Sequence, residues 1–210
     1  MKHVIFSFLL GIFLASATGM AAADLPPDVL AKTTTDEVLE VLRNNQDIRT
    51  DPKRVTELVE AKVLPNFDFN KMTRLAVGKG WRQATPEQRE TLVSEFRNLL
   101  VRTYGSSLTK YKNETVEFKP FKMEPQATDV TVKSQIMRTD GGQPIAVDYS
   151  MEKTPNGWKV YDVTVEAVSL VTTYRGSFSD EVQRSGIDGL IASLQQKNRD
   201  AAAARAAPAK

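Results

Sequence analysis

The sequence has no cysteine, and its single histidine, His3, lies in a segment that we expect to be removed. A mature chain without thiol and imidazole groups cannot use Ser–His–Asp or Cys–His catalysis. It also cannot hold zinc, haem or an iron–sulfur cluster through those ligands. No Asp/Glu triplet has the spacing of a Ca²⁺ loop. Binding chemistry without a cofactor is therefore the expectation, and stability must come from packing without disulfides.

Long hydrophobic runs are also missing, except at the N-terminus. Lys2 precedes an apolar run at residues 4–14, and three alanines follow at 21–23. This is the pattern of a secretory signal peptide over residues 1–23, with Asp24 as the mature N-terminus. No later stretch approaches the roughly 20 apolar residues of a membrane span. We therefore expect an exported, soluble protein, and the lack of cysteine excludes an N-terminal lipid anchor.

Neither sign of charge dominates the chain. Without Lys2 there are 27 Lys and Arg residues against 26 Asp and Glu residues. A nucleic-acid-binding protein would show a stronger basic excess or a dense basic patch, so no nucleic-acid partner is expected. The mature length suits one domain, which we place at residues 24–200 and expect to be a monomer. The Ala-rich residues 201–210 are expected to form a disordered tail.

Apolar residues recur at helical spacing over residues 25–111. Asp51 followed by Pro52, and the capping box at residues 85–88, are typical of helix starts. Gly105 would end the last of these helices. Helical spacing returns after Val168 and is interrupted by Gly186.

Between these regions, residues 114–166 alternate apolar and polar positions, with turn sequences at 140–142 and 155–157. The pattern predicts an antiparallel sheet of about four strands. The whole order predicts an α+β fold of N-terminal helices, sheet and C-terminal helices, with an apolar cavity between helices and sheet.

Motifs of catalysis are incomplete. Ser107 and Lys110 match S-x-x-K of penicillin-recognising enzymes, but the K-T-G and S-D-N elements are absent. Asp162 and Glu166 near the end of the last strand remain possible acid–base groups, or else they belong to a solvated face or a helix cap. We therefore expect no catalytic residue.

Three aromatic residues and a methionine gather between residues 67 and 81. They are either ordinary core or the wall of a large apolar cavity, for which such adaptable side chains are suited. Facing positions of the sheet would supply the opposite wall. The candidate lining residues are Phe67, Phe69, Met72, Leu75, Trp81, Phe96, Leu100 and Tyr104 before the sheet, Val130, Val132, Val147, Tyr149, Met151 and Val163 in it, and Leu170, Tyr174 and Arg175 after it.

An ordered set of motifs resembles the MlaC family, the toluene-tolerance periplasmic phospholipid-binding proteins. Its parts are Pro65, Phe67-Asp68-Phe69, Met72, Gly80-Trp81, Gln88, Phe96, Leu100 and Tyr104, then Val168-Ser169-Leu170-Val171, Tyr174-Arg175, Phe178, Gly186-Ile187-Asp188, Leu190-Ile191 and Leu194. The set covers nearly the whole mature chain. Thr173 stands where the family pattern has Asn.

The resemblance implies a non-enzymatic periplasmic carrier of glycerophospholipid. It also implies two partners, an inner-membrane ABC transporter with an MCE-domain subunit and an outer-membrane lipoprotein–porin complex, with outer-membrane lipid asymmetry as their shared task. Two alternatives from the residues remain: an enzyme acting on a hydrophobic substrate, and an interaction module with an exposed apolar groove.

Arg175 is the one charged residue among the candidates. It could meet a lipid phosphate at the cavity mouth. The alternative is a structural pair with Asp68, Asp162 or Glu166, which we favour because most charges in a domain of balanced charge pair with one another or face solvent.

Overall fold

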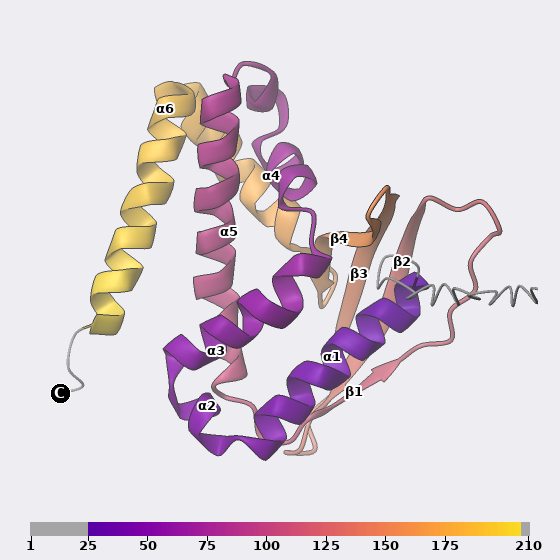
Figure 1. The fold of residues 1–210 in the computed structure, drawn as a ribbon. Coiled ribbons are helices and arrows are strands. Elements are labelled where there is room, and N and C mark those ends of the chain that lie inside the picture. Colours follow the sequence, from indigo (N-terminus) through magenta and orange to yellow (C-terminus); the bar gives the residue numbers. More distant parts are fainter. Residues whose placement is uncertain (1–24, 207–210) are drawn as a thin grey trace, which may run out of the picture.

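The computed structural model describes residues 25–206, so the expected signal peptide at 1–23 and residues 207–210 lie outside the described range. Helices α4, α5 and α6 (Leu170–Ala206) stand together on one side, α1 crosses in front of the sheet, and α3 lies against the lower part of α5 (Figure 1). The helices and short helical turns before the sheet are α1 (Pro27–Asn44), α2 (Gln46–Thr50), α3 (Pro52–Leu58), η2 (Val59–Val63), η3 (Leu64–Asn66), α4 (Phe69–Val77), η4 (Gly78–Arg82) and α5 (Pro86–Leu108). The prediction of an α+β fold is confirmed.

All strands of the sheet are antiparallel and follow one another in chain order. They are β1 (Thr115–Phe118), β2 (Asp129–Met137), β3 (Ile145–Thr154), β4 (Gly157–Val165) and β5 (Val168–Ser169). The sheet therefore has five strands rather than about four, since two residues are too few for β5 to show alternation. The expected turn at 155–157 is present, with Thr154 paired to Gly157, whose φ is +88°. A bulge between Ser150 and Met151 shifts the register of β3 and β4.

The helix starts follow their capping chemistry. Asp51 accepts a bond from the backbone N–H of Lys53 at the start of α3, and Asp68 accepts one from Lys71 at the start of α4. At the start of α5, the backbone N–H of Gln88 donates to Thr85 Oγ1 over 3.2 Å, and the backbone N–H of Thr85 donates to Gln88 Oε1 over 2.9 Å. The predicted capping box is thus confirmed.

Two predicted helix ends are wrong. Helix α5 passes through Gly105 and ends at Leu108, because a glycine without a positive φ fits a helix interior. Helix α6 (Leu170–Ala206) continues through the Ala-rich segment, so residues 201–206 are helical rather than disordered; alanine is the best helix former. Gly186, with φ 70° and ψ −172°, divides α6 into two helices. This confirms the prediction that Gly186 interrupts the helical region.

Three buried clusters form the core of the described chain, and the third surrounds Leu42 of α1 and Tyr111. The largest joins α4, α5 and α6 and includes Met72, Leu92, Phe96, Phe178 and Leu190. The second joins α1 to the sheet. Its buried members are Leu30, Ala31, Val132, Met151, Trp158 and Val160.

The helical layer is attached to the sheet near Val160. The backbone N–H of Asp68 donates to the carbonyl oxygen of Val160 over 2.8 Å, and Phe67 forms a parallel bridge with the same residue. The side chain of Lys159 donates to the carbonyl of Pro65 over 2.6 Å. These bonds place the start of α4 directly against β4.

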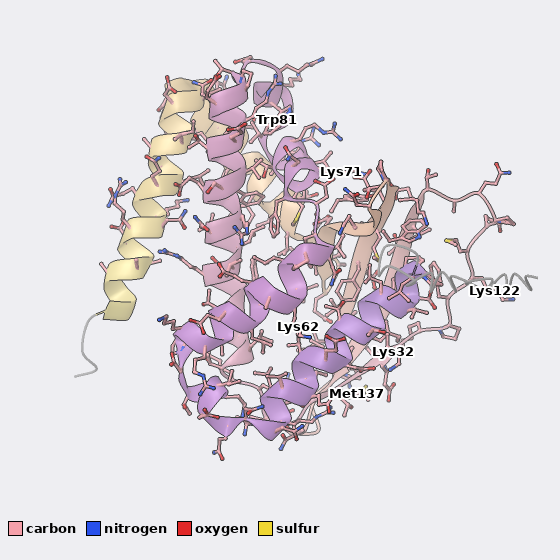
Figure 2. All side chains as sticks on the ribbon, viewed as in Figure 1. Lys32, Lys62, Lys71, Trp81, Lys122 and Met137 are labelled. Atoms are coloured by element: carbon pink, nitrogen blue, oxygen red, sulfur yellow. The ribbon has the colours of Figure 1, made fainter. Side chains whose placement is uncertain are left out.

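A polar cluster reinforces this attachment. Lys71 of α4 lies 2.6 Å from Glu152 Oε2 and 3.5 Å from Asp129 Oδ2, and its ammonium lies 3.5 Å from the ring centre of Tyr161. The hydroxyl of Tyr161 donates to Asp129 Oδ1 over 2.9 Å. Figure 2 shows Lys71 on α4, beside the strands. Partial burial and this hydrogen bond to Asp129 raise the pKa of Tyr161 to about 12.

Gly105 and Gly186 allow a matched comparison of how replacing a helical glycine by alanine changes the free energy of unfolding. No described atom lies within 4 Å of a Cβ added to either, but only Gly186 has a positive φ. Gly105→Ala should raise the free energy of unfolding by about 0.5–1 kcal/mol, because alanine loses less backbone entropy in a helix. Gly186→Ala should lower it by about 1–3 kcal/mol, because its φ and ψ suit glycine alone. Urea unfolding measures both, and shifts in the same direction would contradict this account.

Tyr161 should lose its proton at a higher pH than an ordinary tyrosine. Its folded-state pKa is about 12, against the ordinary value of 10 for tyrosine, so the stability that the neutral phenol contributes is fully present below pH 10. That contribution is lost as the pH rises through 12. The tyrosinate absorbance of the wild type minus that of Tyr161→Phe should show this step, and unfolding of the variant should depend less on pH between 10 and 12. A difference curve centred near pH 10 would rule the cluster out as the cause.

Candidate functional site

A large cavity of about 1050 Å³ lies between the helices and the sheet. This volume is at the upper end of the range of about 300–1,000 Å³ for small-molecule sites. Its walls come from α1, η2, the C-terminal half of α5 and strands β1 to β4, and most lining side chains are apolar. The attachment at Phe67 and Val160, both of which line the cavity, closes one part of it.

Many predicted lining residues do line this cavity. Phe67 and Phe69 stack with ring centres 5.8 Å apart. On the sheet, Tyr149 pairs with Val163 across β3 and β4, which puts the two on one face. The predicted residues that the cavity brings together are Phe67, Phe69, Met72, Leu100, Tyr104, Val147, Tyr149, Met151, Val163 and Leu170.

Four predicted residues lie in the helical core instead. The ring of Phe96 is fully buried, 5.0 Å from the ring centre of Tyr174 in an edge-on contact. Leu75 and Trp81 pack against the same cluster. Figure 2 shows Trp81 among the helices, beyond the end of α4. The expectation that these residues line the cavity is wrong, because helical spacing alone does not say which neighbour a face meets.

Val130 and Val132 lie on the correct side of the sheet but are covered. Val132 pairs with Tyr149, and Val130 with Met151, so all four share a face. Both valines pack in the cluster that contains Leu30 and Ala31 of α1, and Val132 has no exposed surface. Helix α1 therefore separates them from the cavity.

Arg175 fits neither of its two interpretations. It is exposed and outside the cavity lining. Its guanidinium lies beside Gly78, where a Cβ added to the glycine would be 3.5 Å from Nε of Arg175. Asp68 and Glu166 accept backbone N–H bonds from Lys71 and Ala146 instead. Asp162 caps α6 by accepting from Val171 and from Ser169 Oγ, which confirms the cap interpretation of that carboxylate. Among the described residues, Arg175 forms no ion pair with any of the three.

The sequence interpretation missed the walls that come from α1, η2 and the strand ends. These lining residues are Leu30, Ala31, Val38, Leu39, Val59, Val63, Val116, Ile136, Ile145 and Val165. The apolar stripe of residues 27–44 is a helical signal, but it does not show that the helix faces a cavity. Val59 and Val63 lie in a π-helical turn, whose wider spacing has no clear sequence signature.

Exposure is confined to one end of the cavity. Among the described lining residues, every exposed one belongs to residues 104–112, at the end of α5, or to residues 138–140, after β2. The charged lining residues lie there too. They are Lys110, Lys112, Glu114, Arg138 and Asp140. We call this end the mouth.

The polar groups differ between the mouth and the interior. At the mouth, Arg138 Nε donates to Asp140 Oδ1 over 2.9 Å, and this bond holds the pKa of Asp140 at about 2. In the interior, burial raises the pKa of Tyr149, so its phenol stays neutral. Within the described residues, no three His, Cys, Asp or Glu side chains are grouped to hold a metal ion. The arrangement suits an amphipathic ligand with its apolar part inside and its polar part at the mouth.

No helix within residues 25–206 combines the length and apolar character that a membrane crossing requires.

Known proteins resemble this chain along most of its length. The family model "MlaC protein" matches residues 32–196. The intermembrane phospholipid transport system binding protein MlaC of Haemophilus influenzae is 27% identical over 195 residues, which cover 91% of this chain and 90% of that protein. Toluene tolerance protein ttg2D of Pseudomonas putida is 29% identical over 170 residues, covering 80% and 77% of the two chains.

A solved structure shares the fold. The phospholipid-binding protein from Ralstonia solanacearum, determined in complex with a phospholipid, aligns with a TM-score of 0.78 and 38% identity. The alignment covers 85% of this chain and 99% of that one. The resemblance seen in the sequence motifs is confirmed, and the chain belongs to the MlaC family.

Proposed function

We propose that this protein is a phospholipid carrier that performs no chemistry. The acyl chains occupy the cavity and the headgroup lies at the mouth. The observation that carries the proposal is the division of one cavity into an apolar interior and a charged, exposed end. The phospholipid bound to the Ralstonia solanacearum relative supports the choice of ligand.

Hydrophobic free energy explains why such a carrier is needed. A diacyl lipid has about 30 methylenes, and at about 0.8 kcal/mol each its transfer through water would cost on the order of 20 kcal/mol. Enclosing the chains removes most of that cost. Because the sequence contains no G-x-x-x-x-G-K-S/T nucleotide-binding loop, transfer would follow affinity differences between partners or be driven by one of them.

The setting we propose is the periplasm, after removal of residues 1–23. The partners would be an inner-membrane ABC transporter with an MCE-domain subunit and an outer-membrane lipoprotein–porin complex, and the carrier would act as a monomer in maintaining outer-membrane lipid asymmetry. The name of the Haemophilus influenzae relative, an intermembrane transport system binding protein, supports this placement.

The ionisable groups around the cavity favour binding over catalysis. The two lining carboxylates, Glu114 and Asp140, lie at the mouth and accept bonds from the backbone of Lys112 and from Arg138. In the interior, the neutral phenol of Tyr149 is the titratable group whose pKa is shifted, and it is raised away from neutrality. A general base would need a pKa near the working pH.

The direct test is denaturing mass spectrometry of protein purified from the envelope without detergent. We expect phospholipid at close to one molecule per chain. Protein that carries no lipid, or that releases it in a buffer wash, would contradict the proposal.

Val147→Trp tests where the acyl chains lie. Val147 lines the cavity, so the indole should fill ligand space, and lipid occupancy should fall while the lipid-free protein melts at nearly the same temperature. Val132→Trp is the matched control, because Val132 is fully buried beneath α1 and overpacking there should cost about 1–3 kcal/mol. Occupancy by mass spectrometry and thermal melting of delipidated protein separate the two effects. If Val147→Trp lost stability but kept its lipid, the acyl chains would not lie against this wall of the cavity.

A further inference from the structure

The charges at the mouth are not all paired. Arg138 and Asp140 form a two-bond ion pair, and the carboxylate of Glu114 accepts the backbone N–H of Lys112 over 2.6 Å. The ammonium groups of Lys110 and Lys112 contact no carboxylate within the described chain. Both lysines are exposed and line the cavity. The mouth therefore presents two positive charges, those of Lys110 and Lys112, that no described carboxylate neutralises.

These lysines differ from the other cations of the chain by their position. Lys110, Lys112 and Arg138 are the cations of the cavity lining, and Arg138 is neutralised by Asp140. Arg175, the cation expected from the sequence, lies outside the lining. A ligand whose apolar part fills the interior would therefore bring its polar end to Lys110 and Lys112.

Lysine ammonium groups bind phosphate oxygens as compact charges. A zwitterionic headgroup carries an ammonium of its own beside the phosphate, and two nearby lysines would repel it. A headgroup of net negative charge meets no such repulsion. Resting on the proposed carrier function, we infer that the mouth is a headgroup site in which Lys110 and Lys112 select anionic over zwitterionic phospholipids.

The experiment offers both lipid classes in one bilayer. Delipidated full-length mature protein is incubated with vesicles of equimolar phosphatidylglycerol and phosphatidylethanolamine with identical acyl chains, and the lipids it extracts are counted by mass spectrometry. Since both lipids share one membrane, differences in vesicle encounter cancel. From the usual strength of two exposed charge pairs, we expect about fivefold enrichment of the anionic lipid at low salt. At about 1 M salt, where the screening length is near 3 Å, the enrichment should largely disappear.

Three variants assign the effect to residues. Lys110→Glu with Lys112→Glu should bring the ratio to one or below while total lipid uptake persists. Lys110→Arg with Lys112→Arg should keep the preference and shows that charge is the property required. Lys122→Glu with Lys133→Glu makes the same charge change outside the cavity lining and should leave the ratio unchanged.

The outcomes separate the two proposals. Equal uptake of both lipids by the wild type, or an unchanged ratio in the Lys110/Lys112 charge reversal, would overturn headgroup selection and leave the carrier function intact. A ratio that shifts equally in the Lys122/Lys133 variant would assign the preference to overall charge and would also overturn it. Failure of the wild type to extract any lipid would overturn the carrier function itself, and headgroup selection with it.

Discussion

The backbone hydrogen bond from Asp68 to Val160 fixes where the helical layer meets the sheet. Around it, Lys159 reaches the carbonyl of Pro65, and Lys71 reaches Glu152. All three contacts lie between the start of α4 and the ends of β3 and β4 next to their connecting turn. Away from this junction, the space between α1, the end of α5 and the sheet is the cavity. The mouth, at the end of α5 and after β2, is formed from other parts of both layers.

This geometry makes one apolar surface serve two purposes. Where the layers are close, Val132 and Trp158 pack as ordinary core in the cluster that contains Leu30 and Ala31 of α1. Where the layers separate, Val147 and Val163 line the wall of the cavity. Since both kinds of residue are apolar and alternate identically along the strands, their chemistry is the same and only their distance from the helices differs.

That identity explains what the sequence could and could not predict. Alternation located β2, β3 and β4, and side-chain capping located the starts of α3 and α5, because these signals are local. The division between cavity wall and core was right for Phe67 and Tyr149 but wrong for Phe96 and Val132, because it depends on how helices from distant segments are placed over the sheet. The uncommitted lysines at the mouth were missed as well. Nothing local to residues 110–112 shows that the chain there borders an opening.

The helical core has its own consequence for the proposed transport cycle. Its buried residues, from Met72 in α4 to Leu194 in α6, pack mainly with one another, and Gly186 lets the second half of α6 run back along α5 (Figure 1). Most of this packing does not involve the cavity, so it persists whether or not a ligand is present. If the protein is the carrier that we propose, its empty form should therefore stay folded, and the time between release of one lipid and uptake of the next need not be short.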